Sequence, residues 1–562
     1  MDHPVLKVSG LGISFRNEDK WNQVIKQISF EVLPNEILGI VGESGSGKSV
    51  SSLAVMGLLP SKISKIDSGF VVFKGNDITQ LSDKQFQNIR GKELSMIFQE
   101  PMSSLNPSMS CGKQVAEILE RHTIFSEKEI KAEVLRLFEQ VKLPEPKTLY
   151  NKYPHQISGG QKQRVMIAMA IACKPEVLIA DEPTTALDVT VQKEIILLLK
   201  NLQKETGMSI VFISHDLALI SEICDRVLVM YKGEIVEQGN IEQIFHHPEH
   251  IYTKALIASR PSLEVRLRRL PTIQDYLEHK ENAVEVTTEE RKKHLEKLYH
   301  QKPLLRVVNV EKEYVVKTQL FRADKTFKAV DNVSFDIYEG ETLGLVGESG
   351  CGKSTLGNAI LQLDPATKGQ IFYKDKDITR LSKKELKDLR KEIQIIFQDP
   401  FASLNPKITI GEAILEPMKV HKLYKNDKER KEKVLELLEK VGLLPEHFDR
   451  YPHEFSGGQR QRIGIARTIA VNPKLIICDE SVSALDISVQ AQVLNLLNDL
   501  KENFGFTYLF ISHDLAVVKY ISDQIIVMNK GKIEEQNEAD TLIANPQQSY
   551  TQKLIDAIPK GI

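Results

Sequence analysis

The sequence is poor in cysteine and in long apolar runs. Its five cysteines, Cys111, Cys173, Cys224, Cys351 and Cys478, are widely spaced and form no C-x-x-C pair. We therefore expect thiols in a reducing compartment, with no cysteine metal site or redox couple. No apolar run reaches the roughly 18 residues of a membrane-spanning helix, and the start of the chain lacks a signal-peptide pattern. These absences predict a cytosolic protein that does not cross a bilayer by itself.

An excess of charge of either sign is also missing. The 74 basic and 76 acidic residues give a formal charge of −2, so no overall field favours binding to nucleic acid or to an anionic membrane. With 41% hydrophobic and 27% charged residues, the composition is that of an ordinary folded protein. The length of 562 residues is too great for a single core and predicts several domains.

The chain contains one set of motifs twice. The pairs are VGESGSGKS (41–49) and VGESGCGKS (346–354), FQEPMSSLNP (98–107) and FQDPFASLNP (397–406), YPHQISGGQKQR (153–164) and YPHEFSGGQRQR (451–462), and ISHDLA (213–218 and 511–516). Their nearly constant separation indicates a duplicated domain rather than a solenoid. We predict domains at 1–261 and 304–562, joined by a charged linker at 262–303 that includes a solvated helix at 289–299.

Short apolar runs lead into the motifs. They lie at 37–41, 177–180 and 209–213 in the first copy and at 343–346, 475–478 and 507–511 in the second. We expect each to form a buried strand of a mainly parallel α/β sheet, which binds its ligands at the carboxyl ends of the strands. Residues 108–152 and 407–450 are charged and helix-periodic, which predicts a helical subdomain inserted in each copy.

In each copy, one P-loop follows the first strand run. The pattern G-x-x-x-x-G-K-[ST] occurs at Gly42–Ser49 and Gly347–Ser354, between a predicted strand and a predicted helix. Glycines allow backbone N–H groups to surround phosphate, the lysine reaches the β and γ phosphates, and the serine binds Mg²⁺. The predicted ATP-binding residues are Gly42, Ser44, Gly45, Gly47, Lys48 and Ser49, and in the second copy Gly347, Ser349, Gly350, Gly352, Lys353 and Ser354.

Two acidic residues stand where the next strand ends. Asp181 and Glu182 have the counterparts Asp479 and Glu480. The aspartates suit a metal ion, and the glutamates suit a water molecule aligned for attack on the γ phosphate. Such a pair alone is more often a solvated turn, but a P-loop on the same sheet favours catalysis.

His215 and His513 directly follow a strand run. Each could donate to a γ phosphate or cap the next helix. Gln99 and Gln398 precede a proline-bounded stretch, from which either could reach Mg²⁺ or the attacking water. These residues are weak indicators singly, and their recurrence with the P-loops is what favours function.

Two further features can contact the nucleotide. SGGQ at 158–161 and 456–459 opens a helix whose N-terminal amides suit an anion, with simple helix capping as the alternative. The candidate residues are Ser158, Gly160 and Gln161, and Ser456, Gly458 and Gln459. Phe15 and Tyr314 lie on the strand that opens each copy, where a ring could stack on adenine or pack in the core.

The motifs, in this order and twice, closely resemble the nucleotide-binding domains of ABC transporters. The resemblance implies two composite ATP sites in a head-to-tail arrangement, with Lys48 facing Ser456–Gln459 and Lys353 facing Ser158–Gln161. It also implies that Asp188 of Ala186-Leu187-Asp188 and Asp486 of Ala484-Leu485-Asp486 communicate across the interface.

Within that family, the sequence resembles the importers for dipeptides, oligopeptides and nickel. The resemblance lies in the motifs FQ-[ED]-P-x-x-SLNP and YPH-x-x-SGGQ and in the tails at 247–256 and 545–554. It implies an ATPase subunit at the cytoplasmic face of a prokaryotic inner membrane, with two transmembrane permeases and an extracytoplasmic binding protein as partners. Segments 101–107 and 400–406 would dock the permeases. The cysteine-rich tail of many members is absent, so we expect no iron–sulfur cluster.

Soluble tandem-ATPase translation factors that act on the ribosome are the alternative. They share a D-E-P-T-N-H-L-D segment and a long basic arm between the domains. This chain has DEPTTALD (181–188), DESVSALD (479–486) and a linker of mixed charge. These differences favour an importer for di- or oligopeptides.

Overall fold

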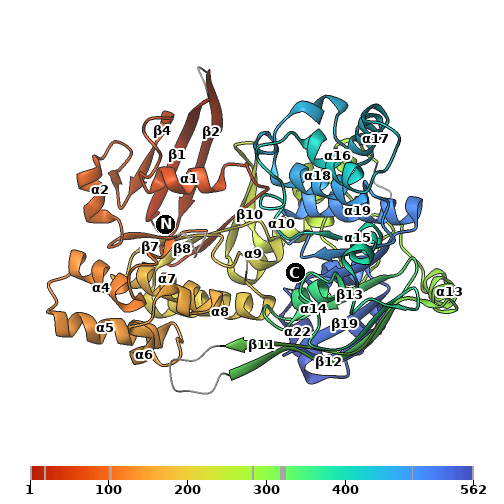
Figure 1. Ribbon diagram of the computed structural model, residues 1–562. Helices are drawn as coiled ribbons and strands as arrows, with labels where there is room; N and C mark the ends of the chain where they lie inside the picture. The colour runs from red at the N-terminus through yellow and green to blue at the C-terminus, as the bar shows by residue number, and fades with distance from the viewer. Residues whose placement is uncertain are drawn as a thin grey trace. The chain divides into compact units, whose positions relative to one another are not determined.

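The computed structural model describes residues 3–17, 20–99, 104–185, 187–280, 284–316, 325–483 and 485–559. The chain forms two compact units, each described here by itself (Figure 1). The first comprises chiefly Met1–Ile257, with Tyr276–His279, and the second comprises chiefly Ala258–Asp275 and Lys280–Ile558. Each unit carries one complete set of motifs.

The first unit contains two sheets and a helical part. Its strands are β1 Leu6–Asn17, β2 Lys20–Val32, β3 Ile37–Val41, β4 Ser64–Phe73, β5 Asn76–Asp77, β6 Leu94–Ile97, β7 Val177–Asp181, β8 Ser209–Ser214, β9 Arg226–Tyr231 and β10 Glu234–Asn240. Its helices are α1 Lys48–Val55, α2 Asp83–Ile89, α4 Cys111–His122, α5 Glu127–Gln140, α6 Pro146–Tyr150, η1 Pro154–Gln156, α7 Gly159–Ile171, α8 Val189–Thr206, α9 Leu217–Ile223, α10 Ile241–His246 and α11 Ile251–Ala258.

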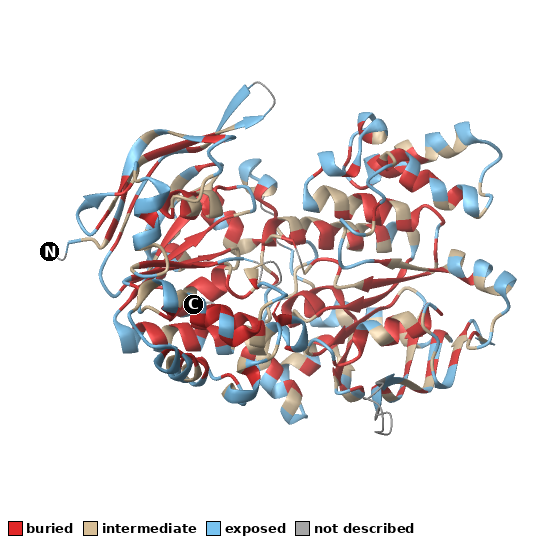
Figure 2. Cartoon of the chain, turned by 60° about the vertical axis from the view of Figure 1, so that its left-hand side comes forward, coloured by how far each residue is buried: buried red, intermediate tan, exposed pale blue. Residues whose placement is uncertain are grey.

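The six-stranded sheet of this unit has the order β10-β9-β3-β8-β7-β6. Its pairs are parallel except for β9 with β10. The strands β3, β7 and β8 are buried along their whole length, as Figure 2 shows for the interior of the fold. Because parallel strands end at one edge of the sheet, this topology brings the residues that follow β3, β7 and β8 together. A second, antiparallel sheet has the order β2-β1-β4-β5.

The second unit repeats this architecture. Its strands are β11 Pro303–Val316, β12 Lys325–Tyr338, β13 Thr342–Val346, β14 Lys368–Tyr373, β15 Lys376–Asp377, β16 Ile393–Ile396, β17 Leu475–Asp479, β18 Thr507–Ile511, β19 Gln524–Asn529 and β20 Lys532–Glu538. Its helices are α13 Thr288–Tyr299, α14 Lys353–Ile360, α15 Lys383–Glu392, α16 Ile410–Val420, α17 Asp427–Lys440, η2 Pro445–Asp449, η3 Pro452–Glu454, α18 Gly457–Ile469, α19 Ile487–Phe504, α20 Leu515–Ile521, α21 Ala539–Ala544 and α22 Ser549–Ala557. A further helix, α12, spans Ile273–Leu277. The sheet orders are β16-β17-β18-β13-β19-β20 and β12-β11-β14-β15.

The predicted fold class is confirmed. All six apolar runs form strands, namely β3, β7 and β8 and their counterparts β13, β17 and β18. The inserted helical parts also form, as α4 to α6 and as α16 to η2. Among the residues that the structure describes, no helix combines the length and apolarity needed to span a membrane.

The segment between the two motif sets packs on the second unit. The helix predicted at 289–299 forms as α13, which begins at the capping residue Thr287 and buries Leu298. Leu270 is also buried, in the core of the second unit. The Asn495 side chain fixes it, since its Oδ1 accepts from the Leu270 N–H at 2.9 Å and its Nδ2 donates to the Leu270 carbonyl at 2.8 Å. Much of the segment is therefore a layer of that unit rather than a free spacer.

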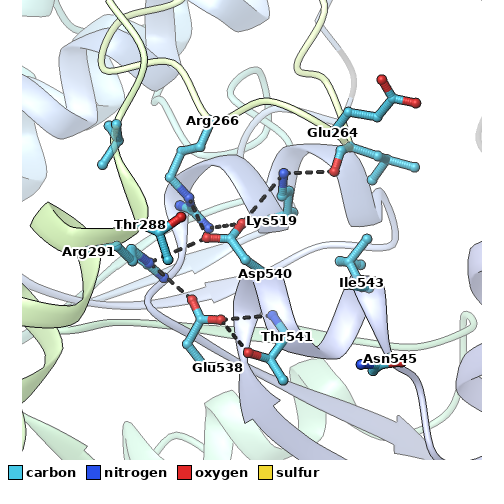
Figure 3. A pocket seen from close by; sticks show the side chains of 13 residues that line it. Glu264, Arg266, Thr288, Arg291, Lys519, Glu538, Asp540, Thr541, Ile543 and Asn545 are labelled. Atoms are coloured by element: carbon cyan, nitrogen blue, oxygen red, sulfur yellow. Dashed lines mark hydrogen bonds and ion pairs between the residues drawn. The ribbon is translucent and has the colours of Figure 1, made fainter.

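A group of ion pairs holds this layer in place; we call it the linker clamp. It comprises Arg266, Arg291 and Lys519 with the acceptors Asp523, Glu538 and Asp540, and it borders a cavity of about 630 Å³ (Figure 3). Figure 3 shows Arg266 directed at Asp540 and Arg291 directed at Glu538. The nitrogen–oxygen distances of these two ion pairs are 3.2 and 3.0 Å. Lys519 Nζ donates to the backbone carbonyl of Leu263 at 2.7 Å. The clamp thus joins the segment to α20, β20 and α21.

Replacing Arg291 by Gln should destabilise the second unit. The Arg291 side chain is 12% exposed, and besides Glu538 it donates to the Asp523 carboxylate at 2.9 Å and to the carbonyl of Ser522. Removing Arg291 takes one cationic partner from the buried Asp523 carboxylate and from Glu538, which is costly in a buried ion-pair group. We expect the free energy of unfolding at pH 7 to fall by about 3 kcal/mol in urea titrations. Lys293→Gln is the matched control, because Lys293 lies on the same helix in an exposed pair and should change little.

The effect of Arg291→Gln should also depend on pH. Burial raises the pKa of Asp523, but Lys501, His294 and Arg291 together lower that pKa well below its usual range. A carboxyl group with a depressed folded pKa stabilises fully above its unfolded pKa of about 3.9 and loses that contribution as the pH falls. The difference from the wild type should therefore shrink below about pH 4. A difference that is constant from pH 7 to pH 3 would contradict the role of Asp523.

Candidate functional site

Each P-loop holds its lysine in a buried position. In the first unit the loop joins β3 to α1, and Lys48 Nζ donates to the carbonyls of Gly42 and Glu43 at 2.6 and 2.9 Å. Gly47 has a φ of 105°, and a Cβ there would lie 2.3 Å from the side chain of Ile25, so glycine is required. The loop therefore encloses a buried positive charge at the N-terminus of α1.

The second P-loop reproduces this geometry between β13 and α14. Lys353 Nζ donates to the carbonyls of Gly347 and Glu348 at 2.7 and 3.0 Å. Gly352 has a φ of 109°, and a Cβ there would lie 2.2 Å from the Ala329 carbonyl oxygen. Each loop thus places a lysine ammonium group at a helix N-terminus, an arrangement suited to a negatively charged ligand.

A serine and an aspartate meet beside each P-loop. Ser49 Oγ donates to Asp181 Oδ1 at 3.1 Å, and Ser354 Oγ donates to Asp479 Oδ1 at 2.9 Å. Burial raises the pKa of Asp181 to about 6 and raises that of Asp479 as well. A hydroxyl and a carboxylate oxygen at this spacing fit a Mg²⁺ ion, whose charge would favour the ionised carboxylate.

Glu182 lies at the centre of a hydrogen-bonded group at the end of β7. Its Oε2 accepts from Gln99 Nε2 and from Thr185 Oγ1, both at 2.9 Å, and its Oε1 lies 3.3 Å from His215 Nδ1. Its backbone has a φ of 47°, a left-handed conformation that is uncommon outside glycine. Burial raises the Glu182 pKa, but the contacts to His215 and Thr185 and the charge of Lys48 outweigh burial and lower it to about 2. The carboxylate is therefore ionised at neutral pH.

The second unit assembles the same group with one contact fewer on its carboxylate. Glu480 also has a φ of 47°; Gln398 Nε2 donates to its Oε2 at 2.8 Å, and His513 Nδ1 lies 3.6 Å away. The counterpart of Thr185 is Ser483, which donates to the Glu480 backbone carbonyl instead of the carboxylate. Sequence reasoning missed Thr185, although the difference between DEPTT and DESVS is the signal that distinguishes the two copies.

The SGGQ segments form the exposed starts of two helices, α7 and α18, whose later turns are largely buried. The Ser158 hydroxyl accepts from the Gln161 N–H at the start of α7, and Ser456 does the same for Gln459 at the start of α18. Both serines are exposed. A Cβ on Gly160 would lie 2.8 Å from the Val191 side chain at the start of α8, so the glycine permits close helix packing.

The remaining candidates are less closely tied to the P-loops. The Phe15 ring packs partly against the core of the first unit. Tyr314 is 40% exposed, with its hydroxyl bonded to Asp364. Asp188 and Asp486 occupy the N-cap positions of α8 and α19. Ala186, Ala484 and residues 101–103 of the first docking segment lie outside the described residues.

Comparison with known proteins identifies the family of the chain. A family model described as ABC transporter matches residues 25–185 and 330–483. A second, described as oligopeptide/dipeptide transporter, C-terminal region, matches 236–285 and 534–561. The glutathione import ATP-binding protein GsiA of Escherichia coli is 49% identical over 99% of this chain and 89% of its own length. The protein of the same name from Salmonella choleraesuis is 47% identical over the same shares.

A solved structure of a dimeric bacterial ABC transporter cassette is also similar. It is 31% identical to this chain and covers 42% of it and 98% of its own chain, with a TM-score of 0.38. The family assignment rests instead on the two sequence models and on the relatives that span nearly the whole chain. The chain belongs to the ABC transporter family, as an ATP-hydrolysing subunit of the importer type.

Proposed function

We propose that the chain powers the uptake of small peptides. The observation that carries this proposal is the oligopeptide/dipeptide transporter C-terminal region, which matches at the end of both copies. Relatives named for import of glutathione, which is a tripeptide, support a cargo of that size. Two transmembrane permeases and an extracytoplasmic binding protein would complete the importer, with this chain at the cytoplasmic face of a prokaryotic inner membrane. The comparisons give the translation-factor alternative no support.

Each P-loop would bind the triphosphate of ATP. The backbone N–H groups of Ser44, Gly45 and Gly47 would surround the phosphates, and Lys48 would turn from its carbonyl acceptors to the β and γ oxygens. Ser49 and Asp181, with Gln99, would hold Mg²⁺, which when bound supplies neutralising charge at the phosphates. Ser349, Gly350, Gly352, Lys353 and Ser354, with Asp479 and Gln398, would have the same roles in the second unit.

Glu182 would align the attacking water. Its carboxylate is ionised and lies at the strand end beside the P-loop, so it can accept a proton from that water. His215 holds the carboxylate from one side and Gln99 from the other, which fixes its direction. Glu480, His513 and Gln398 would act in the same way.

Each site would be completed by the SGGQ segment of the other copy. The exposed N-termini of α7 and α18 are suited to an anion, and a P-loop alone leaves one side of the γ phosphate open to water. Phe15 and Tyr314 would stack on adenine. The permeases would dock on 101–107 and 400–406.

An uptake measurement in a strain that lacks this chain tests the proposal. The wild-type chain should restore uptake of radiolabelled dipeptides or of glutathione, because ATP hydrolysis drives their import. A chain carrying both Glu182→Gln and Glu480→Gln should not restore it, whereas the surface variant Lys293→Gln should. Normal peptide uptake without the chain, or sedimentation with ribosomes and no permease association, would reject peptide import.

A further inference from the structure

The C-terminal region matched by the second family model, 236–285 and 534–561, is here called the C-terminal extension, and in each copy a glutamate near its start fixes a helix. In the first unit Glu237, on β10, accepts from the N–H groups of Glu249 at 2.8 Å and His250 at 3.1 Å, just before α11. Glu535, on β20, makes the same pair of bonds just before α22, at 2.9 and 3.0 Å. Charged acceptors on N-terminal amides hold a helix start firmly. Each extension helix is therefore anchored to the second strand of a hairpin, β9–β10 in the first unit and β19–β20 in the second.

Each of these helices places a tyrosine hydroxyl on a P-loop amide. The Glu43 N–H donates to Tyr252 Oη at 3.0 Å, and the Glu348 N–H donates to Tyr550 Oη at 3.2 Å. The Tyr252 ring is fully buried and stacks on Tyr231, with 4.2 Å between the ring centroids. The same contact is thus built twice, from YTKAL at 252–256 and YTQKL at 550–554.

The tyrosine contact falls on a peptide that Lys48 also holds. The Lys48 ammonium donates to the carbonyls on either side of the Glu43 amide, at Gly42 and at Glu43 itself. When the ammonium turns to phosphate oxygens, these carbonyls lose that donor. The Tyr252 hydroxyl accepts from the Glu43 N–H, so it can hold this peptide in place after the ammonium has moved to phosphate.

We propose that Tyr252 and Tyr550 are positioning residues for ATP binding, through which the C-terminal extension keeps each P-loop in its binding conformation. The proposal rests on the P-loops being the ATP sites. Preorganising a binding loop lowers the cost of binding without touching the reacting atoms. The tyrosines should therefore act on ATP affinity more than on the rate of hydrolysis.

The test measures ATP affinity one site at a time. In a Lys353→Ala background, the site of Lys48 is the intact one, and the dissociation constant of ATP can be measured by equilibrium dialysis. Adding Tyr252→Phe should weaken binding about three- to tenfold, the effect of losing one hydrogen bond. Since phenylalanine keeps the stacked ring, the melting temperature should stay close to that of the parent. In an otherwise wild-type chain, Tyr252→Phe should raise KM for ATP and leave kcat within about twofold.

Two controls come from the chain itself. Tyr550→Phe in the Lys353→Ala background should leave ATP affinity unchanged, because its partner Glu348 lies in the other loop. Tyr231→Phe removes the hydroxyl of the stacked neighbour and should also have no effect. Unchanged affinity in the Tyr252→Phe variant, or equal losses from Tyr252→Phe and Tyr550→Phe, would overturn the proposal. Absence of ATP binding in the Lys353→Ala parent would instead contradict the ATP site of Lys48.

Discussion

Replacing both Glu182 and Glu480 by Gln should reduce ATP turnover by about 10²- to 10⁴-fold, which is the usual contribution of a positioned proton acceptor. Glutamine keeps the shape of the side chain but cannot accept the proton of the attacking water. The Gln99 and Gln398 amides that donate to these carboxylates lie within 2.9 Å and can remain nearby. ATP binding should therefore persist while hydrolysis fails, as phosphate release and nucleotide retention would show.

The single variants test whether both sites work. Each of Glu182→Gln and Glu480→Gln should lower turnover substantially, because both units assemble the same glutamine, glutamate and histidine group. Glu139→Gln on the exposed face of α5 is a matched control and should leave turnover unchanged. Full activity in either single variant would refute two competent sites. Because Glu182 also accepts from Thr185, any inequality should appear as a difference between the two single variants.

The pairing of P-loops with SGGQ segments should be revealed by double variants. If each site uses the SGGQ of the other copy, Ser456→Arg disables the site of Lys48, since the bulky side chain occupies the exposed helix start that should meet the γ phosphate. Lys48→Ala with Ser456→Arg then damages one site and leaves the other assembled. Lys48→Ala with Ser158→Arg damages both. Trapped nucleotide, counted in a Glu182→Gln and Glu480→Gln background, should differ clearly between the two combinations.

The two double variants control for each other, because each combines one P-loop substitution with one SGGQ substitution. Folding defects from the loss of either serine cap would affect both combinations similarly. Equal nucleotide retention would rule out the head-to-tail arrangement. Since the two units are covalently joined, ATP-driven closure should not depend on protein concentration unless two chains exchange halves.

The sheet and the P-loops could be predicted because their signals are local. Runs such as Ile37–Val41 are apolar throughout, which is typical of a strand buried on both faces, and the glycine pattern that follows them has one common use. Glycine at 47 was expected, and the close approach of Ile25 explains it. The left-handed backbone of Glu182 carries no such signal, since glutamate rarely adopts it.

The clamp and the tyrosine contacts depend on long-range pairing. Arg266 and Arg291 look like solvated charges in the sequence, but their carboxylate partners lie more than 200 residues further along the chain. The hydroxyl of Tyr252 likewise meets an amide 209 residues earlier. The recurrence of YTKAL and YTQKL at the ends of both copies is the signal that could have directed attention to these tyrosines.

The segment between the two motif sets makes the two copies unequal as modules. By sequence, 258–285 is largely the tail of the first copy, since the C-terminal region model matches 236–285 there. By packing, Ala258–Asp275 and α13 belong to the second unit. Dividing the chain at residue 303 would remove Leu270, Arg266 and Arg291 from the second unit and expose the surface that they cover. Dividing the chain after Ile257 would keep this layer on the second unit and would separate only Tyr276–His279 and the last residues from the first, so the boundary set by packing precedes the boundary of the repeat.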